Sequence, residues 1–315
     1  MQRAYMSNLM EIAEKDNRVL HILADSGTGF DELFRHNFPE RMYNFGIAEE
    51  NMVAAAAGMA SAGKIPFVYT AGAFLAYRSF EFIRDDVCFQ NLNVKIVGMG
   101  SGLSWSSLGP THHTTEDLSV LRSLPNLMIL SPSTPKQVSE SVKIAYQHIG
   151  PVYIKIGMNN EKEFFSDDYI LQEDSFDILV GTDISETDYL IFTTGSVLEE
   201  ASDAVKVLCE KNVKISLINV PVIKPFANKK VLELIKNTKA VFTIEEHSIT
   251  GGLGTILCEL VAENALGIPV KRIGLNDKFA EGYGTQKIVR IQNGLDALSI
   301  ANKIETIINQ FGVNQ

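Results

Sequence analysis

The stretch YNFGIAEENMVAAAAGMA occupies residues 43–60 of the sequence. It predicts a short apolar strand that turns at Gly46 into a helix whose first residues are Glu49 and Glu50. Acids suit a first helical turn because they offset its exposed N–H groups and the positive end of the helix dipole, so helix-start chemistry alone explains one of the two. The rest of the helix is small and apolar nearly all round, which predicts burial on all sides and close approach by another helix. A carboxylate at the mouth of such a helix is a candidate for catalysis.

The composition is that of an ordinary globular protein, with 45% hydrophobic and 21% charged residues. A length of 315 residues exceeds a typical single core, so two domains are expected. The formal net charge of −10 argues against nucleic acid or a membrane surface as partner, because both require a basic surface. The N-terminal residues include no apolar signal core, and no apolar run approaches the roughly 20 residues of a membrane span. We therefore expect a cytoplasmic protein.

The three cysteines, Cys88, Cys209 and Cys258, lie far apart in the sequence. None belongs to a CxxC pair or has a neighbouring pair of histidines. This spacing predicts small core residues in a reducing compartment, and it disfavours disulfides, a zinc site and a cysteine nucleophile.

Apolar strands alternate with helical periods in the first half of the chain. The expected strands are residues 19–24, 66–70, 94–100, 127–131 and 152–157, and the expected helices are residues 2–14, the Glu49 helix, 76–90 and 134–148. Continuous apolar strands that alternate with helices are typical of a parallel sheet covered on both faces.

A change of character divides the chain. Residues 158–177 contain acids and Asn pairs without a regular period, as expected of a connection between domains. A second series follows, with strands at residues 189–193, 214–220, 240–245 and 270–274 and helices at 196–211, 229–237, 254–264 and 295–310. The prediction is an α/β protein of two α/β domains, residues 1–165 and 186–315, joined by a linker at residues 166–185.

Glycine-rich segments at residues 98–102 and 251–254 invite a nucleotide-binding interpretation. The first is not followed by a helix with the dinucleotide fingerprint, and the second lacks both the GxGxxG spacing and the P-loop lysine. A tight turn with close helix packing explains the second segment better, while the short loop at residues 25–29 is ambiguous.

Phe74, Tyr77 and Phe80 are spaced by three and are expected to form one aromatic face at the start of a helix. Taken alone, they fit an ordinary core stripe best. The functional alternative is a stacking platform for a planar heterocycle.

His112 and His113 lie in the segment LGPTHHTTEDL, residues 108–118. A His pair in a Gly-Pro loop is more often solvated than catalytic, and adjacent histidines point in different directions, which disfavours joint metal binding. The loop nevertheless follows a predicted parallel strand, which is where open α/β sheets place their sites.

These separate features meet in one family. The segments NFGIAEENMVAAAAGMA, AGAFLAYRSFEFIRDD, GPTHHTTEDLSVLRSLPNLMILSPS and GPVYIKIG resemble the pyrimidine-binding domain of transketolase and of 1-deoxy-D-xylulose-5-phosphate synthase. The segments NVPVIKPF, FTIEEHSITGGLGT and GYGTQKIV resemble the C-terminal domain of the same enzymes, so the resemblance covers essentially the whole sequence.

The family's full-length members begin with a further domain that binds the cofactor's diphosphate through a metal ion, using a GDG motif and a distal Asn. No GDG motif occurs in this sequence. The resemblance therefore implies the C-terminal subunit of a split transketolase, with an N-terminal transketolase subunit as partner in an α2β2 heterotetramer. Thiamine diphosphate would be shared between the subunits, Mg2+ or Ca2+ would be bound mainly by the partner, and sugars or sugar phosphates would be the substrates.

The resemblance also implies roles in cofactor binding. Glu49 matches the catalytic glutamate that contacts N1′ of the aminopyrimidine, where a hydrogen bond stabilises the imino tautomer, whereas Glu50 occupies a variable position. Phe74, Tyr77 and Phe80 match the aromatic pocket around the aminopyrimidine, which reverses the preference for a core stripe. Residue Asp25 matches an acid near the cofactor.

Four further residues are implied in substrate binding. His112 matches a catalytic histidine that faces the substrate, where it would hydrogen-bond the donor hydroxyl or the nascent oxyanion. His113 stands where many relatives have Gln, and Arg3 matches an arginine that binds substrate phosphate in transketolases. Lys155 is a candidate replacement for a lost cation, as a point charge without the Arg fork.

Departures from the family pattern concern the substrate. Leu108 replaces an Asp that senses a sugar hydroxyl, Gly100 and Met158 replace a His and an Arg on the acceptor phosphate, and Ser101 replaces a phosphate-binding Arg of the synthases. These changes predict an acceptor other than the usual pentose phosphate, either without a terminal phosphate or larger and modified.

Two other functions stay open. The β subunit of a 2-oxo acid dehydrogenase has the same two domains and a similar length, although the GPTHHTTEDLSVLR loop favours transketolase. A noncatalytic regulatory homologue is the other alternative, which the presence of Glu49, the three aromatic residues and His112 disfavours.

Overall fold

The computed structural model describes residues 1–26 and 29–313. Residues 27 and 28 of the ambiguous loop, and residues 314 and 315 of the predicted second domain, lie outside the described residues. The α-helices are α1 (Gln2–Lys15), α2 (Asp31–Asn37), α3 (Glu49–Ser61), α4 (Gly72–Arg78), α5 (Phe80–Phe82), α6 (Asp117–Leu121), α7 (Pro135–Gln147), α8 (Leu198–Glu210), α9 (Asn228–Ile235), α10 (Leu253–Glu263), α11 (Gln286–Gln292) and α12 (Ala297–Val313). The strands are β1 (Val19–Leu23), β2 (Met42–Asn44), β3 (Ile65–Ala71), β4 (Lys95–Met99), β5 (Met128–Leu130), β6 (Val152–Ile156), β7 (Asp177–Gly181), β8 (Tyr189–Thr194), β9 (Ile215–Asn219), β10 (Val222–Lys224), β11 (Ala240–Ser248) and β12 (Val270–Leu275).

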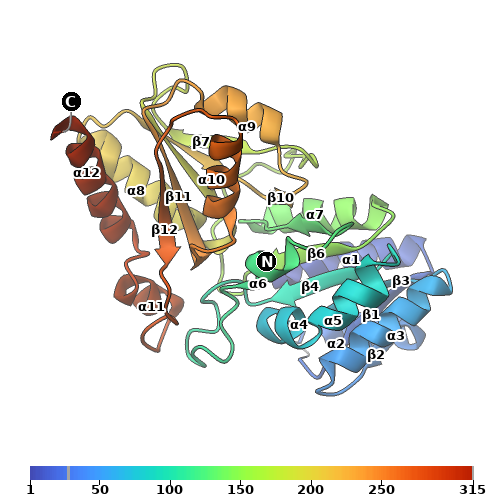
Figure 1. The fold of residues 1–315 in the computed structure, drawn as a ribbon. Helices are drawn as coiled ribbons and strands as arrows, with labels where there is room; N and C mark the ends of the chain where they lie inside the picture. The colour runs from blue at the N-terminus through green and yellow to red at the C-terminus, as the bar shows by residue number, and fades with distance from the viewer. Residues whose placement is uncertain (27–28, 314–315) are drawn as a thin grey trace.

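The first domain is built on a sheet with the strand order β10-β5-β6-β4-β3-β1-β2. Its strands are parallel except at the β10 edge. Side chains of α1 and α7 pack into one apolar cluster with this sheet, and those of α3 and α4 pack into another. The sheet is thus covered on both faces (Figure 1), as its continuously apolar strands predict.

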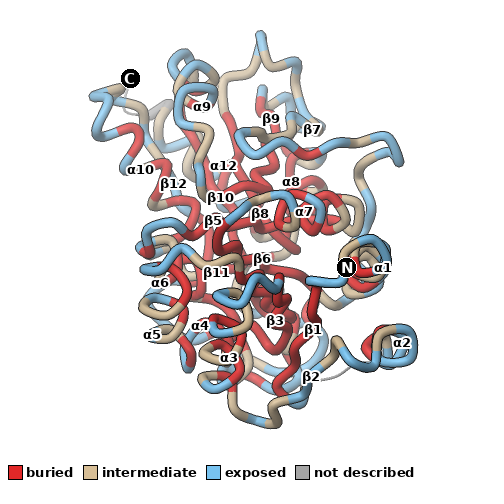
Figure 2. Tube along the Cα trace, turned by 90° about the vertical axis from the view of Figure 1, so that its right-hand side faces the viewer, coloured by how far each residue is buried: buried red, intermediate tan, exposed pale blue. Residues whose placement is uncertain are grey.

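The second domain has a sheet with the order β12-β11-β8-β9-β7, in which β7 is the antiparallel edge. Side chains of α8 and α12 share one apolar cluster with this sheet. Those of α9 and α10 join the cluster that contains α3, so the cores of the two domains are continuous. Figure 2 shows this as a buried band running through the strands of both sheets. The prediction of two α/β domains is confirmed.

Two strands cross the boundaries predicted between the domains. β7 lies inside the segment 166–185 that was expected to be a linker, yet it pairs with β9 of the second sheet. β10, which the sequence analysis missed, follows β9 in the chain but pairs with β5 of the first sheet, with Val222 opposite Leu130. The domains are therefore tied together by main-chain hydrogen bonds as well as by a shared core.

The helix predicted for residues 76–90 is divided into three pieces. α4 ends at Arg78, the short α5 begins at Phe80, and residues Ile83–Cys88 form a π-helical segment. Ser79 separates the first two pieces. Phe80 consequently does not continue the helix that carries Phe74 and Tyr77.

α3 is buried on one side only in this single chain. Met52, Val53 and Ala56 pack into the core, whereas Asn51, Gly58 and Ser61 are exposed. The prediction of burial on all sides is therefore wrong for the isolated chain. The uncovered side of the helix is smooth, because its exposed side chains are small.

The cysteines are free, as predicted, with Cys88 buried and Cys209 and Cys258 partly buried. Within residues 1–26 and 29–313, no helix has the length and apolar character needed to span a bilayer.

Candidate active site

The parallel order of the first sheet gathers several predicted residues at one edge. Asp25 follows β1, Glu49 follows β2 and Phe74 follows β3, while His112 lies in the long segment after β4. These strands are neighbours in the sheet, so their carboxyl ends lie side by side. This edge is where open parallel sheets hold their ligands.

Glu49 is the first residue of α3, and its side chain is only 2% exposed. Gly46 makes the turn that precedes it, with a φ of +70° that favours glycine. The Arg78 guanidinium Nη1 lies 3.1 Å from Glu49 Oε2. Glu49 is thus a buried carboxylate that is ion-paired at the mouth of the site.

Arg78 connects Glu49 to a row of rings. Its guanidinium carbon lies 4.0 Å from the centre of the Phe74 ring. The Phe74 ring meets the His112 ring edge-on at 4.9 Å, and the Trp105 ring lies 6.1 Å from His112. We call Glu49, Arg78, Phe74, His112 and Trp105 the Glu49 cluster.

The three predicted aromatic residues are not equivalent. Phe74 belongs to the Glu49 cluster, whereas Tyr77 is partly exposed and exchanges hydrogen bonds with Glu116. Phe80 packs against the core of the domain. Among the described residues, no ring contact joins Phe80 to Phe74 or Tyr77. The three residues therefore do not form one aromatic face, since Phe74 and Tyr77 lie in α4 and Phe80 lies in α5.

His112 and His113 point into different surroundings, as expected of adjacent residues. His112 is partly exposed, and its Nδ1 lies 2.9 Å from Thr111 Oγ1. Its pKa is lowered by burial and, secondly, by the nearby Arg78 charge, so the imidazole is neutral at pH 7. The His113 ring is buried, and its Nε2 has no hydrogen-bond partner in the described structure. Burial also lowers the pKa of His113.

Asp25 is held beside the Glu49 turn by Asn44. The Asp25 amide donates to Asn44 Oδ1 at 3.0 Å, and the Gly46 amide donates to the same oxygen at 2.9 Å. Asp25 has a φ of +51°, a conformation that Asp tolerates better than most residues. One amide side chain thus fixes the ends of β1 and β2 relative to each other.

Two residues predicted to bind substrate lie apart from the cluster. Lys155 is buried, and its Nζ donates to Asp117 Oδ1 at 2.6 Å and to the Thr114 carbonyl at 3.0 Å. This internal ion pair gives no support to a substrate role for Lys155, because the ammonium faces its own chain. Arg3 lies over the Phe30 ring at 5.7 Å, with no contact to the Glu49 cluster among the described residues.

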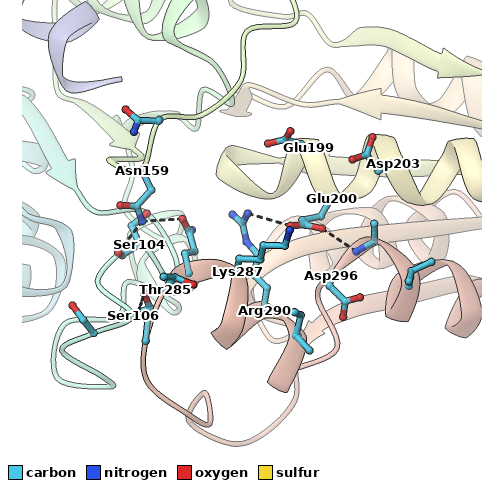
Figure 3. A pocket seen from close by; sticks show the side chains of 17 residues that line it. Ser104, Ser106, Asn159, Glu199, Glu200, Asp203, Thr285, Lys287, Arg290 and Asp296 are labelled. Atoms are coloured by element: carbon cyan, nitrogen blue, oxygen red, sulfur yellow. Dashed lines mark hydrogen bonds and ion pairs between the residues drawn. The ribbon is translucent and has the colours of Figure 1, made fainter.

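A cavity of about 810 Å³ lies between the two domains. Figure 3 shows side chains of the first domain, including Ser104 and Asn159, facing Glu200 and Arg290 of the second. None of the predicted site residues lines this cavity. The Glu49 cluster lies at the carboxyl edge of the first sheet, where Arg78 is exposed and Phe74, Trp105 and His112 are partly exposed.

Sequence reasoning missed Arg78, Trp105 and Asn44. Arg78 stands four residues after Phe74, a spacing that places two side chains on the same side of a helix. Trp105 is the single tryptophan of the chain and lies close before the His pair. Asn44 sits two residues before the glycine of the turn, where an amide side chain often caps the backbone.

The chemistry of the Glu49 cluster fits the aminopyrimidine half of the thiamine cofactor that the resemblance implies. A buried carboxylate can accept or share a proton at a ring nitrogen. The Phe74 ring, which has the Arg78 guanidinium over it, supplies an aromatic contact close to Glu49. No group of three or more His, Cys, Asp or Glu residues in the described parts of the chain is placed to hold a metal ion.

The domain families agree with the two halves of the fold. Residues 1–160 match the family of the transketolase pyrimidine binding domain. Residues 181–297 match the family of the transketolase C-terminal domain.

Relatives with established names cover nearly the whole chain. An apulose-4-phosphate transketolase subunit of Actinobacillus succinogenes is 36% identical over 283 residues, which cover 89% of each chain. The 6-deoxy-6-sulfo-D-fructose transketolase subunit of a Clostridium species is 32% identical, covering 95% of this chain and 92% of the relative. A solved structure described as a split gene transketolase, inactive beta4 tetramer, superposes with a TM-score of 0.85 at 32% identity and covers 97% of this chain and 96% of its own.

Proposed function

The chain belongs to the transketolase family, and from that premise we propose that it is the C-terminal subunit of a thiamine diphosphate-dependent split transketolase. The enzyme would transfer a two-carbon ketol unit from a ketose donor to an aldose acceptor. One observation carries the proposal. The buried carboxylate of Glu49 lies at the same sheet edge as the Phe74 and His112 rings, and Arg78 contacts both Glu49 and Phe74. We take these residues as one wall of the cofactor site.

Each residue of that wall has a role that suits its surroundings. Thiamine diphosphate supplies the carbanion chemistry when bound. Glu49 holds a proton at N1′ of the aminopyrimidine, and the Phe74 ring supports its plane. His112 is neutral near pH 7 because its pKa is lowered, so it can donate a hydrogen bond to a substrate oxygen. Asp25 follows the neighbouring strand β1, where its amide bonds Asn44, and it would be the acid near the cofactor.

The substrate is expected to differ from the usual pentose phosphate. The Trp105 ring occupies the space beside Gly100, since a Cβ at Gly100 would lie 2.0 Å from Trp105 Nε1. No larger side chain fits at Gly100 while Trp105 stays in place. The names of two relatives refer to apulose 4-phosphate and to a sulfonated fructose. Both sugars are ketoses, so these names concern the donor, and the proposal for the acceptor rests on the residues of this chain. If the enzyme turned over ribose 5-phosphate as fast as its unphosphorylated analogue, or faster, that result would count against the proposal for the acceptor.

The partner would be an N-terminal transketolase subunit that carries the diphosphate and Mg2+ or Ca2+ site, in an α2β2 assembly. The exposed side of α3, with its small side chains, leaves a smooth surface next to Glu49 for another chain. The relative solved as a tetramer of β chains alone is described as inactive.

The experiment mixes this chain with a purified N-terminal subunit, thiamine diphosphate and Mg2+. The expected result is a stable complex with ketol transfer, and weak cofactor binding by this chain alone. Full turnover by the single chain would overturn the split-subunit proposal. Acyl transfer to a lipoyl domain by the complex would instead identify a 2-oxo acid dehydrogenase β subunit.

A further inference from the structure

The hydroxyl of Tyr77 is tied to the loop that carries His112. Tyr77 Oη donates to Glu116 Oε2 at 2.8 Å, and the Glu116 amide donates back to Tyr77 Oη at 2.9 Å. The two residues come from different elements, because Tyr77 lies in α4 and Glu116 lies directly before α6. A reciprocal pair of this kind fixes both the distance and the orientation between the two segments.

Glu116 is itself held in place from the side. The Thr115 hydroxyl donates to Glu116 Oε1 at 2.8 Å, so both carboxylate oxygens accept a bond. The neighbouring Thr115 carbonyl accepts a bond from the Ser248 amide at 2.7 Å. Ser248 ends β11, so the second domain reaches the His112 loop at this point.

The residues on either side are fixed to the first domain. The Thr114 amide donates to the Gly102 carbonyl at 2.9 Å, and the Thr114 carbonyl accepts from Lys155. Asp117 is buried, and it accepts from Lys155 at 2.6 Å and from Tyr153 at 2.7 Å. Each residue from 114 to 117 therefore has its own anchor. Of these four residues, Glu116 alone bonds a residue that was predicted to bind the cofactor, namely Tyr77.

From this arrangement we infer that Glu116 is a positioning residue that sets Tyr77 and the His112 loop relative to each other, with the second domain holding Glu116 through Ser248 and Thr115. The inference rests on the proposed function, because it assigns the cofactor side to Tyr77 and the substrate side to His112. By this inference the second domain helps to position the site through Ser248. The residues of the Glu49 cluster themselves all belong to the first domain.

The first test uses the isolated chain and needs no activity. Hydrogen exchange of the amides at residues 109–117 is measured for wild type, Tyr77→Phe, Glu116→Ala and the double variant. Each single variant removes the bond between Tyr77 Oη and Glu116 Oε2 together with one further hydrogen bond of Glu116. Each should therefore exchange at least about 5- to 10-fold faster. Because both single variants lose the bond between Tyr77 Oη and Glu116 Oε2, the exchange rate of the double variant should rise by less than the product of the two single effects. The matched control is Tyr43→Phe, which removes an exposed hydroxyl that bonds the Glu40 carbonyl and should leave the loop unchanged.

The second test uses the assembled enzyme at saturating thiamine diphosphate. Glu116→Ala should lower kcat about ten-fold with an unchanged melting temperature, and Glu116→Gln should recover part of the loss because one amide oxygen still accepts. Additive exchange effects, or loop exchange that is unchanged in Glu116→Ala, would overturn the inference. If Glu116→Ala does not fold, Glu116→Gln and Tyr77→Phe provide the same comparison. Coupled exchange without any ketol transfer would support the link between Tyr77 and the loop and reject the proposed function alone.

Discussion

Arg78 Nη1 lies 3.1 Å from Glu49 Oε2 and joins the start of α3 to the end of α4. The same guanidinium covers the Phe74 ring. A cofactor ring that bonds Glu49 and packs near Phe74 would therefore contact two residues that already contact Arg78. This places Arg78 next to the proposed reaction.

Replacing Arg78 with Met should separate activity from stability. The Arg78 side chain is nearly half exposed but Glu49 is only 2% exposed, so loss of the ion pair and of the contact with Phe74 should reduce the free energy of unfolding by about 1–3 kcal/mol. Ketol transfer by the assembled enzyme should fall much further, because Glu49 loses the group that orients it. Urea unfolding and cofactor-dependent rates measure the two effects. Arg84→Met is the matched control, since Arg84 makes an exposed pair with Asp85 at 2.6 Å. Equal activity of the two variants would refute the role of Arg78.

The two adjacent histidines should respond differently to substitution by Ala. His112→Ala should reduce kcat by about 10²- to 10³-fold with little change in unfolding, because its ring is partly exposed at the site. His113→Ala should destabilise the fold by about 2–4 kcal/mol, because the buried ring leaves a cavity. Steady-state rates and urea unfolding of both variants provide the comparison. A stable but inactive His113→Ala variant would reverse the assignment.

Lys155 should act on stability. Lys155→Met leaves the buried Asp117 without its cation, which should cost about 3–5 kcal/mol of unfolding free energy. The double variant Lys155→Met/Asp117→Leu should regain most of that loss because no unpaired charge is left. Chemical unfolding measures both variants. If Lys155→Met were as stable as wild type but had a raised KM for substrate, the predicted substrate role would be restored.

Lys95 should make stability depend on pH above neutrality. Its ammonium is buried against the carbonyls of His148 and Gly150, and burial lowers its pKa to about 7. Between that value and the ordinary pKa of about 10.4, the unfolded chain binds more protons than the folded chain. The free energy of unfolding should therefore rise with pH in this window, by at most about 1.4 kcal/mol per pH unit from this group. Urea unfolding between pH 6 and 10 should show a smaller rise in Lys95→Met, and parallel curves would contradict the prediction.

The sequence predicted the parts of the fold that depend on local pattern. The buried strands β1, β3, β4 and β6 have continuous apolar runs, and their alternation with helices indicated the covered parallel sheet. β10 was not predicted, because it is only three residues long and its partner β5 is distant in the sequence. The division of the helix after Arg78 also escaped, since Ser79 carries no strong breaking signal.

The candidate site followed a similar division. Glu49, Phe74 and His112 were predicted from their motifs, and the fold brings them together as neighbours or through Arg78. The burial of Lys155 could not be predicted from the sequence, because its partner Asp117 lies at the start of α6, far from Lys155 in the chain. The burial of α3 was also predicted incorrectly, because the helix is more exposed than its sequence indicated. Its apolar pattern predicted complete burial, which the single chain does not provide.

The central claim is that Glu49 carries the proton chemistry and that Glu50 is a first-turn acid. Glu50 is the matched control, because it follows Glu49 in the same turn of α3. The decisive measurement is the ketol-transfer rate of the assembled enzyme with wild type, Glu49→Gln and Glu50→Gln at saturating thiamine diphosphate and Mg2+. We expect a loss of about 10²- to 10⁴-fold for Glu49→Gln and a near-normal rate for Glu50→Gln. A Glu49→Gln variant as active as wild type would contradict it.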